Sequence, residues 1–126
     1  MKKRVFISFA MEDVELRNLL VGQARNDNSP FDFVDMSVKK PWDSEWKTNC
    51  RTKIKGCHGM IAIITKNTKN ASGELWEINC AKDEEIPCIG ICGHPDEHFN
   101  TLPNEIKSLR VIDWNWSNIA KWLKQI

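Results

Sequence analysis

The sequence predicts a single α/β domain with a five-stranded, mainly parallel sheet. Its 126 residues suit one domain with one real core. Apolar runs typical of buried strands alternate with amphipathic helical segments, and no Gly/Ser linker, repeat or low-complexity tract separates them. With 41% hydrophobic and 28% charged residues, the chain is neither disordered nor fibrous. We therefore treat residues 1–126 as one domain.

The residues at the end of the first predicted strand are candidates for lining a ligand-binding crevice. Residues 5–9 are almost continuously apolar, as in a strand covered on both faces, and a helix from about Glu12 to Arg25 follows. Open parallel sheets bind ligands beyond the carboxyl ends of their strands. The residues expected there are Ser8, Phe9, Ala10 and Asp13. The alternative is that Ser8 is a small core residue, and that Glu12 and Asp13 only complement the partial positive charge at the start of the following helix.

The second predicted strand, residues 31–36, presents Asp35 and Ser37 at its carboxyl end. A polar loop containing two tryptophans, Trp42 and Trp46, comes next. Large aromatic side chains in a loop pack on the core, bind a ligand or meet a partner, and packing is the simplest explanation for at least one of them. Ser44 is then expected to cap a helix that runs to about residue 55.

The rest of the chain completes the alternation. Residues 59–65 form the most convincing strand, which we expect at the centre of the sheet, and Ser72 is expected to cap the helix that follows. Strands at 86–92 and 110–114 and an amphipathic helix starting at Ser117 or Asn118 come last. This succession matches a flavodoxin-like sheet of order 2-1-3-4-5, with right-handed crossovers and helices on both faces.

Glu77 is the carboxylate on which the functional hypothesis depends. Its neighbours one turn away on the predicted helix are Gly73, Cys80 and Ala81, so the helix can approach the sheet closely there. A carboxylate in a close-packed stripe is costly unless it is paired or used. The alternative is that the helix is tilted and that Glu77 lies with Glu74 and Glu84 on a solvated acidic face.

Several classes of function receive no support from the sequence. The formal net charge of +1 offers no bulk attraction for nucleic acid or an anionic membrane. The five cysteines form no CxxC pair, and the histidines His94 and His98 flank Pro95, so no metal site is predicted. The sequence lacks a secretory or transmembrane segment, and a cytoplasmic location is therefore expected.

Five segments, RVFISFAMED, FDFVDMS, GMIAIIT, SGELWEI and IPCIGI, together resemble the TIR domain family, and most closely the bacterial TIR-like branch of Thoeris antiphage defence. The resemblance implies that Glu77 acts in cleaving NAD at the nicotinamide glycosidic bond, which gives ADP-ribose or a cyclic ADP-ribose-type signal. NAD is then the substrate and no cofactor is expected. The family's serine and tryptophan before the glutamate are replaced by Ala71 and Gly73, and VKKPWDSEW stands in place of its proline-glycine loop.

The resemblance and the chemistry together suggest roles for other residues. Phe9 or Trp46 is expected to stack on a flat ring, and Ser8 and Ser37 to bond ribose or phosphate oxygens. Asp35 is expected to take ribose hydroxyls. The resemblance also implies a homo-oligomer and a separate effector protein that responds to the product. Neither GxGxxG nor GxxxxGK[ST] occurs, so Rossmann-type and P-loop nucleotide binding are unsupported.

Two other functions stay open. The first is a catalytically silent TIR-like module that works by assembly through the Trp42 to Trp46 loop. The second is a phosphoacceptor receiver domain, which needs an aspartate at the end of the third strand. Glu12 and Asp13 fit its acidic cluster, but the third strand ends in Thr65 and Lys66, and the receiver hypothesis is therefore weak.

Overall fold

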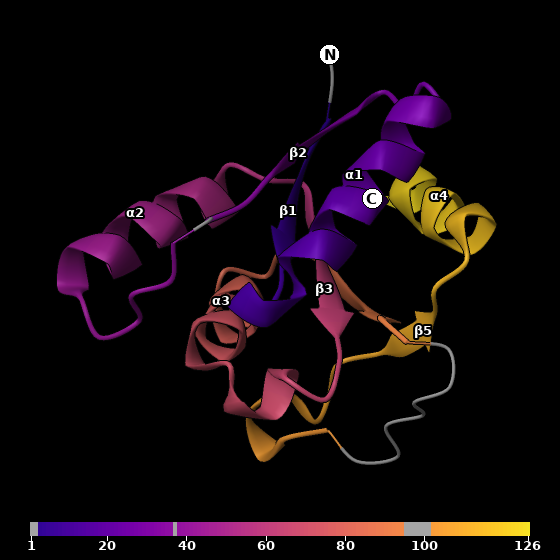
Figure 1. The fold of residues 1–126 in the computed structure, drawn as a ribbon. Coiled ribbons are helices and arrows are strands. Elements are labelled where there is room, and N and C mark those ends of the chain that lie inside the picture. The colour runs from indigo at the N-terminus through magenta and orange to yellow at the C-terminus, as the bar shows by residue number, and fades with distance from the viewer. Residues whose placement is uncertain (1–2, 37, 95–101) are drawn as a thin grey trace.

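The computed structural model describes residues 3–36, 38–94 and 102–126 and has one five-stranded sheet of order β2-β1-β3-β4-β5 (Figure 1). All four neighbouring strand pairs are parallel. The predicted α/β class and strand order are confirmed. No helix among the described residues is both long enough and apolar enough to cross a membrane.

The central strands are the most apolar ones, as their position between two helical layers requires. The strands are β1 (Lys3–Ser8), β2 (Phe31–Val34), β3 (Gly59–Ile64), β4 (Cys88–Cys92) and β5 (Val111–Asp113). Every residue of β3 is buried. The register pairs Ser8 with Ala62, so the carboxyl end of β1 lies level with the middle of β3.

Helices cover both faces of the sheet. The α-helices are α1 (Val14–Asn26), α2 (Ser44–Lys55), α3 (Ser72–Asp83) and α4 (Trp116–Gln125). In the described ranges, three short 3-10 turns connect these elements: η1 (Met11–Asp13), η2 (Thr68–Asn70) and η3 (Asn104–Ile106). In Figure 1, α1 and α4 lie on one side of the sheet and α2 and α3 on the other.

Two hydrophobic clusters follow from the alternation of side chains along the strands. Phe6, Met60 and Ala62 face α2 and α3, where they pack with residues such as Cys50 and Ile78. Their neighbours in the strands face α1 and α4 and pack with residues including Leu20, Ile119 and Leu123. The sheet is therefore buried on both faces, and its carboxyl edge is the place where polar groups gather.

Two predicted helix caps are wrong by one residue. Asp43, and not Ser44, caps α2, because its carboxylate accepts hydrogen bonds from the backbone N–H groups of Glu45 (2.8 Å) and Trp46 (3.1 Å). The N-cap of α3 is Ala71, which has no side-chain oxygen, and Ser72 is already the first helical residue. The second strand ends at Val34, two residues earlier than predicted.

Candidate active site

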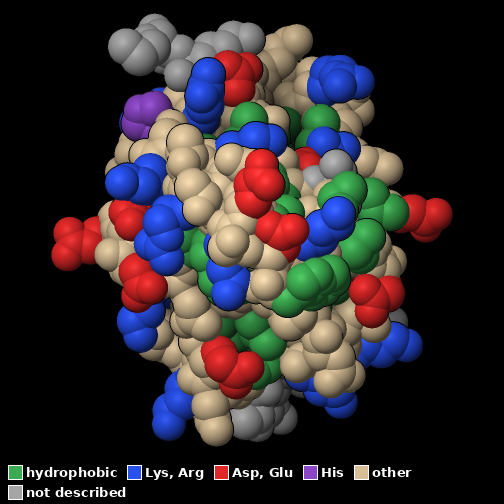
Figure 2. Space-filling view, turned by 90° about the vertical axis from the view of Figure 1, so that its left-hand side faces the viewer, with side chains coloured by type: hydrophobic (Ala, Val, Ile, Leu, Met, Phe, Trp, Pro, Cys, Tyr) green, Lys and Arg blue, Asp and Glu red, His purple; other side chains and the backbone are tan. Residues whose placement is uncertain are grey.

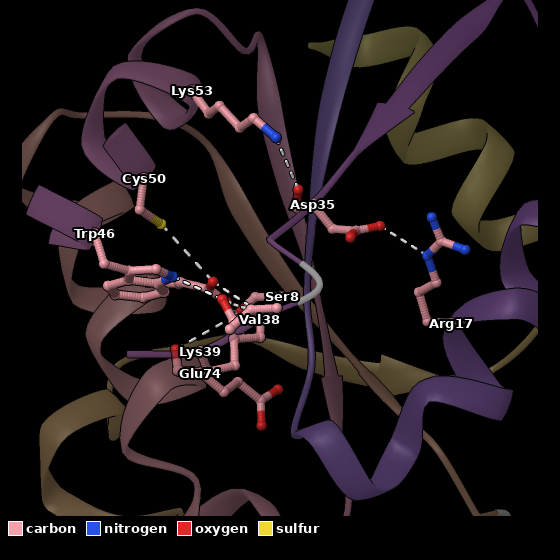
Figure 3. Close-up of polar contacts among 10 residues, drawn as sticks. Ser8, Arg17, Asp35, Val38, Lys39, Trp46, Cys50, Lys53 and Glu74 are labelled. Atoms are coloured by element: carbon pink, nitrogen blue, oxygen red, sulfur yellow. Dashed lines mark hydrogen bonds and ion pairs between the residues drawn. The ribbon is translucent and has the colours of Figure 1, made fainter. Parts of the chain in front are cut away.

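Glu77 lies at the carboxyl edge of the sheet and is completely buried, with 0% of its surface exposed. The Ser8 hydroxyl, at the end of β1, donates a hydrogen bond of 2.8 Å to Oε1 of Glu77. The ammonium of Lys39 lies 2.8 Å from both carboxylate oxygens. Strand β1, helix α3 and the loop before α2 thus meet at one carboxylate, and Figure 3 labels its partners Ser8, Lys39 and Cys50.

Lys39 reaches Glu77 because α3 has no side chain at Gly73. A Cβ at Gly73 would lie 2.8 Å from the Lys39 Cβ and 3.2 Å from its Cγ. The methylenes of Lys39 therefore cross the helix where a larger residue would block them. Only 8% of the Lys39 surface is exposed. The small residue at position 73, which suggested close approach of the helix to the sheet, makes room for a loop lysine.

Burial raises the pKa of Glu77 to about 7, and the charge and hydrogen bond of Lys39 oppose that rise. Hydrogen bonds from Ser8 and from the Cys50 thiol, whose sulfur is 3.7 Å from Oε2, also favour the charged form. For Cys50 itself, burial and then the nearby Glu77 charge raise the thiol pKa. Cys50 is therefore a neutral donor to the carboxylate and not a nucleophile.

A cavity of about 220 Å³ lies beside this cluster. Phe9, Ala10 and Lys39 form part of its wall, and Trp42, which is 76% exposed, stands at its edge. The Lys39 ammonium lies over the Phe9 ring, 4.5 Å from its centroid. Among the described residues, Glu77 does not belong to the lining of the cavity, because Lys39 lies against the carboxylate.

A second buried carboxyl group lies one turn before Glu77 on α3. Glu74 is completely buried and contributes to the cavity wall, and neither of its carboxyl oxygens has a hydrogen-bond partner in the described ranges. Burial raises the pKa of Glu74 well above its ordinary value, and the nearby Thr68 side chain, which does not reach hydrogen-bond geometry with either oxygen, opposes the rise only in part. Burial therefore favours the neutral form of Glu74, and its unpaired oxygens lower stability.

The structure brings some of the predicted site residues together and leaves others apart. Ser8, Phe9, Ala10 and Glu77 lie at one end of the sheet as expected. Asp35 follows β2, but its carboxylate binds Arg17 at 2.7 Å and points away from the Lys39 cluster (Figure 3). Ser37 lies outside the described residues.

Trp46 is not at the cavity but in the core, with 7% of its surface exposed. Its indole N–H donates a 2.7 Å hydrogen bond to the Val38 carbonyl, and its ring meets Trp76 edge to face at 5.4 Å. The simplest explanation given for the tryptophan loop therefore holds for Trp46. Trp42 is the tryptophan at the cavity. The composition of the loop does not show which of the two tryptophans packs in the core and which lies at the surface.

A separate polar cluster closes the turn after β3. The Asp13 carboxylate accepts hydrogen bonds from the Thr65 hydroxyl (2.5 Å) and from the Asn67 amide (3.0 Å). These contacts tie η1 to the loop before α3. The sequence predicted Asp13 in the ligand crevice, but its carboxylate is hydrogen-bonded to Thr65 and Asn67 and holds the turn together.

Sequence reasoning missed Lys39 and Glu74 as members of the site. Lys39 belongs to a basic, polar loop, and such lysines are usually solvated. The available signal was the glycine at position 73, which leaves a gap beside a buried carboxylate. Glu74 entered the sequence analysis only through the alternative of a solvated acidic face, yet its side chain is as buried as that of Glu77.

The sequence comparison decides the family. A family model described as "Thoeris protein ThsB, TIR-like domain" matches residues 6–98. The chain belongs to this family. The match includes the last three residues of β1, the Lys39 loop and all of α3, so Ser8, Lys39 and Glu77 lie in the matched region.

The fold of this TIR-like domain is also found in solved structures. The crystal structure of a prokaryotic SEFIR domain is similar, with a TM-score of 0.55 and 23% sequence identity over 98% of this chain and 89% of that chain. At that identity the likeness concerns the fold alone. None of the curated proteins matches this chain.

The described part of the domain contains no group of three or more His, Cys, Asp or Glu side chains placed to hold a metal ion. Figure 2 shows that the outer face on the α2 and α3 side carries interspersed acidic and basic side chains with exposed hydrophobic ones between them.

We predict that replacing Glu74 by Leu stabilises the domain. The change removes two buried oxygens without partners, so the free energy of unfolding should rise by about 1–3 kcal/mol. Because the Glu74 pKa is raised above its reference value of 4.5, ionisation penalises the folded state as pH increases, and the gain should grow with pH. Urea unfolding at several pH values measures it.

Glu15→Leu is the matched control, since Glu15 is exposed on α1. It should change the free energy of unfolding little. A Glu74→Leu protein less stable than the wild type would show that the Glu74 carboxyl makes a favourable interaction in solution, and would contradict its assignment as an unpaired group.

Proposed function

We propose that this TIR-like domain cleaves the nicotinamide glycosidic bond of NAD, with Glu77 as the catalytic carboxylate. The observation that carries the proposal is the position of Glu77, which is buried at the carboxyl edge of the sheet and oriented by Ser8 and Lys39. Ligand sites of open parallel sheets lie at this edge. The family membership of the chain supports the same location.

The proposed reaction needs few catalytic groups. Nicotinamide leaves as a neutral molecule from a cationic pyridinium, so no acid has to protonate the leaving group. Positive charge develops on the ribose in an oxocarbenium-like transition state, and a fixed carboxylate stabilises that charge. A buried carboxylate is effective because little water competes with it for the developing charge.

The neighbours of Glu77 determine how that carboxylate works. Ser8 and Lys39 both hold its oxygens, so the side chain does not have to be ordered when the substrate binds. Phe9 offers a ring face beside the carboxylate for a flat heterocycle. With a pKa of about 7, Glu77 is charged in a large share of molecules at neutral pH.

The family supports a biological setting for the proposed reaction. We propose a role in antiphage defence, in which the product is ADP-ribose or a cyclic ADP-ribose-type signal that a separate effector protein detects. Assembly into a homo-oligomer is part of the proposal, because exposed apolar side chains such as Trp42 and Val38 offer contact surface on the loop that carries Lys39.

A catalytically silent assembly module is the second candidate function. The Lys39–Glu77 pair favours it, because a carboxylate already paired on both oxygens is closed to a ligand. The exposed indole of Trp42 supplies a contact for a partner. Turnover of NAD by the purified protein, or its absence, separates the two functions.

We predict that Glu77→Gln abolishes NAD cleavage and leaves the fold intact. Glutamine keeps the size of the side chain and removes the charge, and loss of a preorganised stabilising group should lower the rate on the order of 100-fold or more. Mass spectrometry of nicotinamide and ADP-ribose products, alone and in cell lysate, measures the activity. Circular dichroism reports the fold, because loss of the ion pair with Lys39 also lowers the melting temperature.

Glu45→Gln is the control, because Glu45 is an exposed glutamate in the first turn of α2. This protein should match the wild type in rate. A Glu77→Gln protein with full activity would remove Glu77 from the mechanism. A wild type that is folded but inert in both settings would favour the assembly module.

The ionisation of Glu77 predicts how NAD cleavage and protein stability depend on pH. If the charged carboxylate is the working form, kcat/KM should rise with pH and level off above an apparent pKa of about 7. Because this pKa is raised above 4.5, the stabilising contribution of Glu77 is fully present below pH 4.5 and is lost as pH rises through about 7. Unfolding measured over this range should show a smaller decline in Glu77→Gln. A rate that does not change between pH 5 and 8 would contradict the assigned ionisation.

A further inference from the structure

The groups around the Lys39 ammonium form a binding site for a cation. Both Glu77 oxygens lie 2.8 Å from Nζ, and the ring centroid of Phe9 lies 4.5 Å from it. A carboxylate beside an aromatic face attracts positive charge through both its formal charge and the ring quadrupole. The protein itself supplies the cation that fills this place.

Filling the site with a lysine is costly and depends on local geometry. The ammonium is removed from water, with only 6% of the Lys39 side chain exposed, and burial of a charged pair offsets much of its own Coulomb attraction. The side chain also requires Gly73, because a Cβ there would lie within 3.3 Å of three Lys39 carbons. A pair of this kind is weak support for stability alone, which directs attention to a functional role.

Lys39 separates Glu77 from the neighbouring cavity. Phe9, Lys39 and Gly73 belong to the cavity wall, whereas Glu77 lies behind Lys39 and is outside the lining formed by the described residues. The cavity measures about 220 Å³, which is less than the roughly 300–1,000 Å³ typical of small-molecule sites. If the lysine side chain withdrew, the cavity would extend to the carboxylate and to the face of Phe9.

We propose that Lys39 is an internal cation that occupies the subsite for a cationic heteroaromatic ring, and that ligand and lysine exclude each other. A pyridinium ring carries delocalised positive charge and has a flat face, so it matches the Glu77 carboxylate and the Phe9 ring together. The choice of a pyridinium rests on the proposed NAD cleavage, since the nicotinamide ring of NAD is such a cation. The exclusion itself rests only on the contacts of Lys39.

This arrangement has a direct consequence for affinity. Only molecules in which Lys39 has left Glu77 can bind the ring, so the apparent affinity is reduced by the fraction that is open. Anything that draws the Lys39 loop away, such as a contact made by Trp42 at the cavity edge, would raise affinity without touching Glu77. Removal of the Lys39 charge by substitution should also raise the affinity for the ring.

The test is binding of N1-methylnicotinamide chloride, a pyridinium that lacks the rest of NAD, measured by isothermal titration calorimetry. We expect Lys39→Ala to bind it at least 10-fold more tightly than the wild type, and Lys39→Met to gain less because its side chain still fills part of the space. Because loss of Lys39 removes a cause that lowers the Glu77 pKa, binding is measured at a series of pH values, and the gain should grow as pH rises and Glu77 ionises. Neutral nicotinamide should show no comparable gain.

Controls separate the lysine charge from general effects of substitution. Lys40→Ala changes the adjacent, exposed lysine and should bind like the wild type. Lys39→Arg keeps a cation in the site and should remain weak. Adding Glu77→Gln to Lys39→Ala should abolish the gain, because the anion of the site is then missing. Circular dichroism confirms that each protein is folded, and Lys39→Met, which keeps the packing on Gly73, serves if Lys39→Ala does not fold.

Equal binding of the pyridinium by the wild type and by folded Lys39→Ala or Lys39→Met, or weaker binding by both variants, would overturn the proposal. These outcomes do not depend on turnover. A protein that gains pyridinium binding on loss of Lys39 but never cleaves NAD would support the internal cation and reject the proposed reaction. A protein that cleaves NAD but gains no pyridinium binding on loss of Lys39 would support the proposed reaction and reject the internal cation.

Discussion

The buried ion pair between Lys39 and Glu77 is the interaction on which the site depends. A carboxylate with no exposed surface is unfavourable in a protein interior unless charge and hydrogen bonds compensate it. Here Lys39 contacts both oxygens, and Ser8 adds a hydrogen bond from the end of β1. The pair thereby fixes the loop before α2 against α3 and the sheet, and it defines which groups face the cavity.

Several features of the sequence are explained by this pair. Gly73 leaves the space through which the Lys39 side chain passes, and Phe9 provides the ring beneath its ammonium. The Trp46 indole holds the same loop by its hydrogen bond to the Val38 carbonyl, directly before Lys39. The same contacts that stabilise the loop also separate Glu77 from the cavity, so the two proposed functions, NAD cleavage and silent assembly, differ by the position of one side chain.

The fold could be predicted because strand burial is recorded in local composition, whereas the site depends on contacts between distant segments. Glu77 was found from its small neighbours and Ser8 from its place at a strand end. Lys39 was missed because nothing local distinguishes a buried loop lysine from a solvated one. For Asp35, a distant arginine, Arg17, is the partner in the structure, and no spacing rule indicated it.

A double-mutant cycle on unfolding at pH 8 tests most directly whether Lys39 and Glu77 act as one unit. Glu77→Gln alone leaves the buried Lys39 ammonium without its partner and should cost on the order of 3–5 kcal/mol. Lys39→Met should cost less, because loss of Lys39 raises the Glu77 pKa further and favours the neutral carboxyl. The double variant buries neither charge, and we expect it to be more stable than either single variant. If the two losses simply add in the double variant, Lys39 and Glu77 are not coupled, and the account of the site is contradicted.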